Sequence, residues 1–362
     1  MKNNQAAQEK MVEIQFLRLV AVFAVIVFHF TARRASELPY GNWVSGEPWS
    51  LGWLGVELFF IVSGFVIAFS MGKTVSAKVF LINRATRLYP ALVLLLPIVY
   101  LVQRFTPYSP YVDRSTPQNL FGSITLIPPT VLNYFSDQSF DWLTLVLWSL
   151  KVEVFFYLLC SLIFFVIGRD KVTAFVTSLC LLFNSILLVN EYLENQVIEW
   201  GTRTVKVFGF DNLSWFVIGM LMYSLRFNKK SKKPKLALTL VSASTLINLF
   251  LLNESDVGIL IAGAAVIIIA LWFGLFNMVK KFKFEKCILC IGDSSYELYL
   301  VHQGVGLTFL LFLVKSFNLG PFMGAFLGLG IVALVTFLCH LIFSRITRPI
   351  NIRIRAAILR NW

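Results

Sequence analysis

The sequence predicts an all-α, polytopic membrane protein with about ten transmembrane helices and with both termini in the cytoplasm. Of its 362 residues, 57% are apolar and only 14% are charged, whereas a soluble domain carries about 25% charged residues. Apolar runs of about 20 residues, long enough to cross a bilayer as helices, recur along the chain. A β-barrel would instead need alternating apolar and polar residues. This composition also excludes disordered, collagen-like, coiled-coil and disulfide-stabilised proteins.

The distribution of charge between the apolar runs predicts the topology. The runs lie near 12–30, 52–71, 88–103, 145–167, 172–189, 212–225, 236–252, 257–278, 291–314 and 321–343. With a cytoplasmic N-terminus, the inside segments hold 23 of the 32 Lys and Arg residues, and the outside segments hold eleven of the 19 acidic residues. The net charge of +13 therefore reflects cytoplasmic loops rather than nucleic-acid binding. We expect a membrane domain over residues 1–343 and a basic cytoplasmic tail over 344–362.

The first span contains two ionisable residues, which cost at least ~2.5–3.5 kcal/mol each inside a membrane. Arg18 and His29 are eleven residues apart, which on an α-helix is about 16 Å and close to a whole number of turns. Both side chains are therefore predicted on one face, with Arg18 nearer the cytoplasm. Alternatively, the arginine extends to the interface and the histidine bonds a neighbouring carbonyl.

The second and third spans add a carboxylate and two arginines. Glu57 must face an aqueous cavity or meet a partner, while Ser63 and Gly64 are typical of close helix packing. Arg84 and Arg87 are three residues apart and share a helix face at the cytoplasmic entry to the third span. They are either ordinary positive-inside charges or a pair of guanidinium groups suited to binding phosphate.

The fourth and ninth spans each carry a polar face. Ser149, Glu153 and Tyr157 follow at intervals of four residues, and a carboxylate at this depth could fix the tautomer of His29. In the ninth span, Ser295, Tyr299 and His302 share a face, and His302 is expected near the middle of the membrane. His340, in the tenth span, stands alone and is interpreted as structural. A zinc site at Cys287 and Cys290 would need two more ligands nearby, so no metal site is expected.

The layout of these groups predicts a reaction between a donor on one side of the membrane and an acceptor on the other. Arginines suited to phosphate lie on the cytoplasmic side, and acid or base groups lie at the middle and outer side. This arrangement suits a phosphate-bearing donor that enters from the cytoplasm. His29 could then activate an acceptor hydroxyl as a general base, or could itself be acylated transiently.

The motifs resemble those of acyltransferase family 3, the integral-membrane O-acyltransferases that modify bacterial surface glycans. They are Arg18-x10-His29, GVELFFIVSGFVI, RATRLYP, WSLKVEVFFYL and SYELYLVH, in this order over nearly the whole chain. The resemblance implies acetyl-CoA or another acyl-CoA as the cytoplasmic donor and no metal. It also implies transfer to a hydroxyl of a polysaccharide or lipid-linked glycan at the bacterial inner membrane.

The resemblance also implies roles for individual residues. His29 corresponds to the essential histidine, Arg18 to its paired arginine, and Glu153 to the carboxylate of a Trp-Ser-x-x-x-Glu element. Arg84 and Arg87 are associated with the phosphates of the donor, and Ser295 and Tyr296 are assigned to the same site. Contact with substrate or support of the site is assigned to Glu57, Trp148, Ser149, Tyr157, Tyr299 and His302.

Other functions fit part of the pattern. A transporter or flippase for a sugar-lipid or anionic solute would use the same buried polar groups, although the sequence has no evident inverted repeat. A family member that has lost catalysis could act as a scaffold. Some family members also carry an extracytoplasmic esterase-like domain, and here any such activity is expected from a separate partner protein or is unnecessary.

Overall fold

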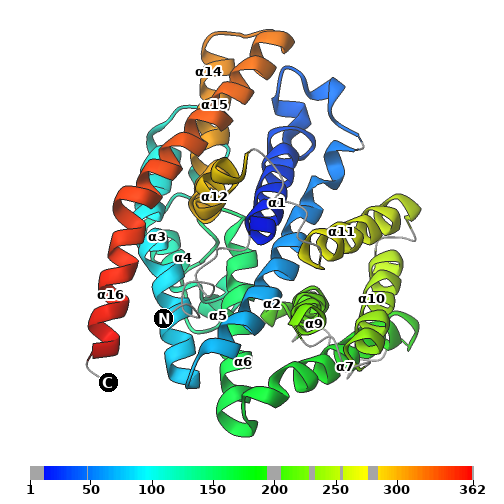
Figure 1. Ribbon diagram of the computed structural model, residues 1–362. Helices are drawn as coiled ribbons and strands as arrows, with labels where there is room; N and C mark the ends of the chain where they lie inside the picture. The colour runs from blue at the N-terminus through cyan, green and yellow to red at the C-terminus, as the bar shows by residue number, and fades with distance from the viewer. Residues whose placement is uncertain are drawn as a thin grey trace.

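The computed structural model describes residues 12–46, 48–193, 205–227, 233–252, 256–275 and 284–360. These residues form helices joined by turns and short loops, and no strand occurs in these ranges (Figure 1). A helix satisfies its own backbone hydrogen bonds, as a span in a bilayer must. The all-α prediction is therefore confirmed for the described part of the chain.

Eight helices in the described ranges are long and apolar enough to cross a membrane. They comprise α1 (Val12–Phe30), α2 (Gly55–Lys73), α3 (Ala77–Phe105), α6 (Leu147–Ile167), α7 (Val172–Leu193), α10 (Lys233–Leu252), the segment Ser295–Ser316 and α15 (Pro321–Ile342). Two other apolar helices are α9 (Leu213–Phe227), with 15 residues, and α11 (Val257–Leu275), whose apolar part is Val257–Trp272. The chain is thus a multi-pass membrane protein, while ten crossings and cytoplasmic termini stay predictions.

Glycines bring α2 and α9 into close contact near the centre of the bundle (Figure 1). A Cβ atom on Gly64 would lie 1.9 Å from the carbonyl oxygen of Phe216, and one on Gly219 would lie 1.9 Å from that of Ile61. Small residues let membrane helices approach until their backbones touch. The sequence interpretation of Gly64 as a packing residue is therefore confirmed.

Helix α3 begins eleven residues before the third span predicted at 88–103. The hydroxyl of Ser76 caps it by accepting from the backbone N–H of Val79 at 3.3 Å. Apolar residues in its first turns pack against the core, so the helix continues through the polar stretch. Arg84 and Arg87 therefore lie within α3 rather than at its entry.

The ninth predicted span, 291–314, is interrupted in the structure. Helix α12 (Glu285–Asp293) ends before Ser294, and α13 (Ser295–Val301) runs into a π-helical turn over His302–Leu307 before α14 (Thr308–Ser316). Single π-helical turns inside helices are frequent at functional sites.

The segment expected as a tail, 344–362, is helical as far as the structure describes it. Helix α15 passes through a π-helical turn, Phe343–Thr347, into α16 (Arg348–Arg360), which packs along α3 (Figure 1). The side-chain amide of Asn351 donates to the backbone carbonyls of Thr86, at 2.8 Å, and Thr347. Basic and apolar residues are interspersed in this helix, and Ile350, Ile352 and Ile354 are exposed beside the arginines.

Short helices cover the end of the bundle near His29. They are α4 (Pro117–Thr125), α5 (Pro129–Tyr134) and 3-10 turns at Ala32–Glu37, Gly41–Trp43, Trp49–Leu54 and Val112–Arg114; others occur at Arg169–Lys171 and Phe210–Asn212. Burial raises the pKa of the Tyr40 phenol, which stays protonated and donates to the carbonyl of Phe30 at 2.9 Å. The hydroxyl of Thr144 donates to Gln303 at 2.8 Å. These bonds tie the outer segments to α1 and to the π-helical turn.

Candidate functional site

Three neighbouring cavities lie between the arginine end of the bundle and His29. We call them the basic, middle and histidine cavities, of about 430, 50 and 270 Å³. Arg87 lines both the basic and the middle cavity, and Val56 and Tyr299 line both the middle and the histidine cavity. Adjacent cavities therefore share walls and form a series, of which the middle cavity is the smallest.

The basic cavity lies between α2, α3 and α16. It is lined by Val66, Phe69, Ser70, Lys73, Thr74, Asn83, Arg84, Thr86, Arg87, Asn351, Ile352 and Arg355. Nη2 of Arg84 donates to the hydroxyl of Ser70 at 2.9 Å, and its guanidinium lies over the rings of Phe80 and Tyr157. Among the described residues, Nε and Nη1 of Arg84 are buried without a hydrogen-bond partner. Such donors suit an anionic ligand.

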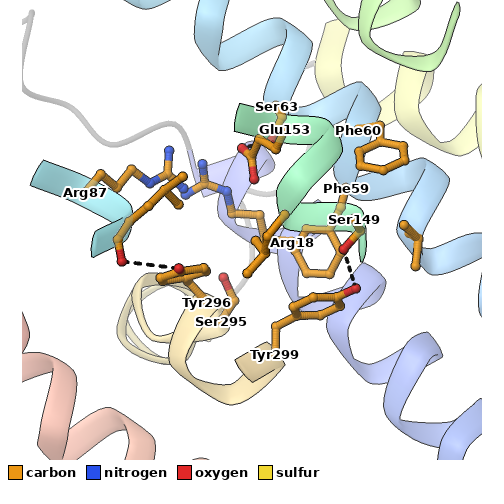
Figure 2. Close-up of a pocket in the computed structure, with 13 residues that line it drawn as sticks. Arg18, Phe59, Phe60, Ser63, Arg87, Ser149, Glu153, Ser295, Tyr296 and Tyr299 are labelled. Carbon is orange, nitrogen blue, oxygen red and sulfur yellow. Dashed lines mark hydrogen bonds between the residues drawn. The ribbon is translucent and has the colours of Figure 1, made fainter. Parts of the chain in front are cut away.

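In the middle cavity, Arg18 and Arg87 extend toward each other from α1 and α3 and meet near Glu153 (Figure 2). The Oε1 atom of Glu153 accepts from the hydroxyls of Ser63, at 2.6 Å, and Tyr157. Two hydroxyl groups thus hold one carboxylate oxygen in place, and the carboxylate offsets part of the positive charge of the arginines. The polar stripe expected on the fourth span exists, and its two inner members contact each other.

The same cavity receives three polar residues of α13 (Figure 2). The hydroxyls of Tyr299 and Ser149 share a hydrogen bond of 2.7 Å, and that of Tyr296 donates to the carbonyl of Leu88 at 3.2 Å. The hydroxyl of Ser295 donates to the carbonyl of Gly292 at 2.8 Å. Of these three α13 residues, Tyr299 alone also borders the histidine cavity, so it separates the two spaces.

Two histidines from α1 and the π-helical turn meet at the histidine cavity. Its lining residues are Val25, Phe28, His29, Arg33, Trp53, Val56, Leu145, Val146, Trp148 and Tyr299. Nδ1 of His29 lies 3.0 Å from the carbonyl oxygen of Val25 and 3.2 Å from Nε2 of His302. Nδ1 of His302, in turn, lies 2.8 Å from the carbonyl oxygen of Tyr299.

These contacts fix the tautomers of both rings. A carbonyl oxygen only accepts hydrogen bonds, so the proton of each neutral ring is on Nδ1. His29 then shares its Nδ1–H between Val25 and the Nε2 lone pair of His302. The remaining lone pair of His29, on Nε2, can take a proton from a bound hydroxyl group.

Two expectations differ from this geometry. His302 occupies the place beside His29 that the sequence interpretation gave to Glu153, because Glu153 turns toward Ser63, Tyr157 and the arginines of the middle cavity. Glu57 is buried but lines none of the three cavities, and its Oε2 has no hydrogen-bond partner among the described residues. We therefore place Glu57 outside the cavity series.

His340 does not stand alone, which corrects the interpretation from the sequence. Its Nε2 lies 3.1 Å from Sγ of Cys290, and its Nδ1 lies 3.1 Å from the carbonyl oxygen of the same residue. Neither residue lines the cavity series. In the part of the chain that the structure describes, no group of three or more His, Cys, Asp or Glu side chains could hold a metal ion.

Several residues that line the cavities belong to no motif that could be recognised in the sequence. Lys73 and Arg355 line the basic cavity, and Arg33 and Trp53 line the histidine cavity. Arg355 falls in the segment expected as a basic cytoplasmic tail. A helix docked on α3 cannot be recognised from basic composition alone. The spacing of Asn351 and Arg355, one helical turn apart, was the available signal.

Comparison with known proteins gives a family match over most of the chain. The family model described as an acyltransferase domain matches residues 11–344. O-acetyltransferase OatA of Staphylococcus aureus strain NCTC 8325 / PS 47 is 26% identical over 324 residues, as is OatA of strain COL. These alignments cover 80% of this chain and 49% of each relative, so the chain spans about half the length of the curated relatives it matches. No solved structure matches the chain.

Proposed function

The chain belongs to acyltransferase family 3, and on that premise we propose that it transfers an acetyl group from acetyl-CoA to a glycan hydroxyl. The donor binds from the cytoplasm, and the acceptor is an extracytoplasmic or lipid-linked polysaccharide. The name of the relatives, O-acetyltransferase, supports both acetyl and a hydroxyl acceptor. We place the protein in a bacterial inner membrane, surrounded by lipids, with no nucleic-acid partner.

One observation carries the proposal, namely the series of cavities between the arginines and His29. Arg84 and Arg87 are positioned to bind the phosphates of the donor, Arg87 being shared with the middle cavity. The pantetheine arm then follows the middle cavity past Arg18, Glu153 and Tyr296. The thioester reaches Tyr299, where the histidine cavity begins.

The reaction needs one base at the meeting point of donor and acceptor. Nε2 of His29 removes the proton of the acceptor hydroxyl, and the oxygen attacks the carbonyl carbon of the thioester. The new C–O bond forms, the C–S bond breaks, and the departing thiolate takes the proton from His29. Arg33, Trp53 and Trp148 line the space in which the acceptor sugar would bind, and aromatic side chains contact sugar rings through apolar surface.

The test uses a strain that lacks the gene and carries a plasmid-borne variant. We expect His29→Ala to abolish acetyl esters on the surface glycan, measured by mass spectrometry, while membrane levels of the protein stay unchanged. His340→Ala is the matched control, because His340 lies outside the cavities, and it should restore acetylation fully. Full acetylation by His29→Ala would contradict the role of His29.

The same site could instead serve a transporter or flippase. A transporter of a sugar-lipid has no need of coenzyme A, so failure of the purified wild type to bind coenzyme A would favour transport. An esterase-like activity, where required, would come from a separate extracytoplasmic protein.

A further inference from the structure

Helix α16 forms one wall of the basic cavity. Asn351, Ile352 and Arg355 line the cavity, and Asn351 and Arg355 are one helical turn apart on the same face. The hydrogen bond from Asn351 to the carbonyl of Thr86 holds this face against α3, one residue before Arg87. Arg353, in the same helix, is exposed and does not line the cavity.

The charge of the cavity calls for a ligand with several negative charges. Lys73, Arg84, Arg87 and Arg355 contribute four cationic groups, and no carboxylate occurs among the described residues that line it. Like charges gathered in one cavity repel each other and attract a polyanion. The unpartnered Nε and Nη1 of Arg84 add two buried donors.

Coenzyme A carries phosphate at two places. A diphosphate joins pantetheine to adenosine, and a separate phosphate monoester is attached to the 3′ oxygen of the ribose. Arg87 borders the middle cavity, so a ligand whose thioester points toward His29 places its diphosphate beside Arg84 and Arg87. The 3′-phosphate is farther from the thioester, which leaves Lys73 and Arg355 as the remaining cations of the basic cavity. Nζ of Lys73 lies over the ring of Phe69, 4.0 Å from its centroid, so Arg355 is the cation that faces the ligand.

We propose that Arg355 on α16 binds the ribose 3′-phosphate, so that the protein distinguishes coenzyme A from 3′-dephospho-coenzyme A. The inference rests on the proposed function, because it assigns one end of the same donor. Arg355 is exposed, so its guanidinium can meet a ligand at the mouth of the cavity with a smaller desolvation cost than a buried one. Helix α16 thereby becomes part of the donor site.

The test measures the affinity of the purified full-length chain in lipid nanodiscs for the two nucleotides by calorimetry. We expect the wild type to prefer coenzyme A about tenfold, the effect of one charge-assisted contact. Arg355→Ala should lose this preference by weakening only coenzyme A, while Arg355→Lys should keep part of it. Arg353→Ala, which removes the same charge from the exposed side of α16, should behave like the wild type.

The possible outcomes separate the inference from the proposed function. Arg84→Ala should weaken both nucleotides, because it removes a contact to the diphosphate that they share. A wild type that binds both nucleotides equally would overturn the inference and leave the proposed function standing, as would an Arg355→Ala variant that weakens both alike. A wild type that binds neither nucleotide would overturn the proposed function and the inference together.

Discussion

His29 and His302 are 273 positions apart in the sequence, yet their rings lie in contact. The shared face of Arg18 and His29 was predictable, because the rise and turn of one helix relate them directly. The contact with His302 was not, since periodicity shows which residues share a face but not which helix lies opposite. For the same reason, the depth of Glu153 in the membrane did not reveal that it contacts Ser63 of α2, whereas its contact with Tyr157 follows from their spacing of four residues.

Replacing His302 should reduce the rate of acyl transfer without affecting donor binding. In His302→Ala, Nδ1–H of His29 loses one of its two acceptors and the ring is held less firmly in its orientation, so we expect kcat to fall about tenfold to a hundredfold. The KM for acetyl-CoA should stay unchanged, because His302 does not line the basic or middle cavity. His302→Gln keeps an accepting atom and should recover part of the rate.

Steady-state kinetics in proteoliposomes, with the thermal unfolding midpoint of each variant, check this role. A purely structural residue would lower the midpoint and leave the kcat of the folded fraction intact. That result, or an unchanged kcat in His302→Ala, would show that His302 does not position His29.

At the scale of the elements, the helices themselves could be predicted and several of their ends could not. Long apolar runs identified α1, α2 and α6 within a few residues. Helix α3 starts earlier, because Ser76 caps it and the preceding polar stretch still has an apolar side. Helix α16 was missed as an element, since its stability depends on packing against α3 rather than on its own composition.

The contact between α2 and α9 should tolerate no added side chain. In Gly64→Ala, the new methyl group would collide with the backbone oxygen of Phe216, and the helices must move apart. We expect a loss of about 2–3 kcal/mol in stability, measured as the unfolding midpoint of the purified protein in detergent. Gly330→Ala in α15 is the control, because no atom lies within 4 Å of the position that its Cβ would take.

The control should be as stable as the wild type or slightly more so, since alanine favours a helix over glycine. A Gly64→Ala variant with an unchanged midpoint would show that α2 and α9 are farther apart than the structure places them.

At the scale of the whole molecule, the positive-inside rule predicts one orientation. The basic cavity lies at the end of the bundle formed by the α2–α3 turn and α16, which the charge distribution assigns to the cytoplasm. The series of cavities could not be foreseen, because it depends on side chains from α1, α2, α3, α6 and α13 together.

Cysteine labelling in whole cells tests this orientation. After replacing the exposed Cys287 and Cys290 with serine, Gln138→Cys should react with a membrane-impermeant maleimide in intact cells. Arg353→Cys should react only after the membrane is permeabilised. The reverse pattern would invert the topology and place the basic cavity on the side where no coenzyme A occurs.

The small volume of the middle cavity, about 50 Å³ beside Arg18 and Arg87, bears on how well the membrane keeps its proton gradient. An enzyme that joins both sides of a membrane risks leaking protons down their gradient. A cavity of this size holds few water molecules, and two guanidinium groups at its wall repel hydronium ions. If the protein has the function proposed above, the site can therefore stay closed to protons between turnovers and still admit the narrow thioester arm of the donor.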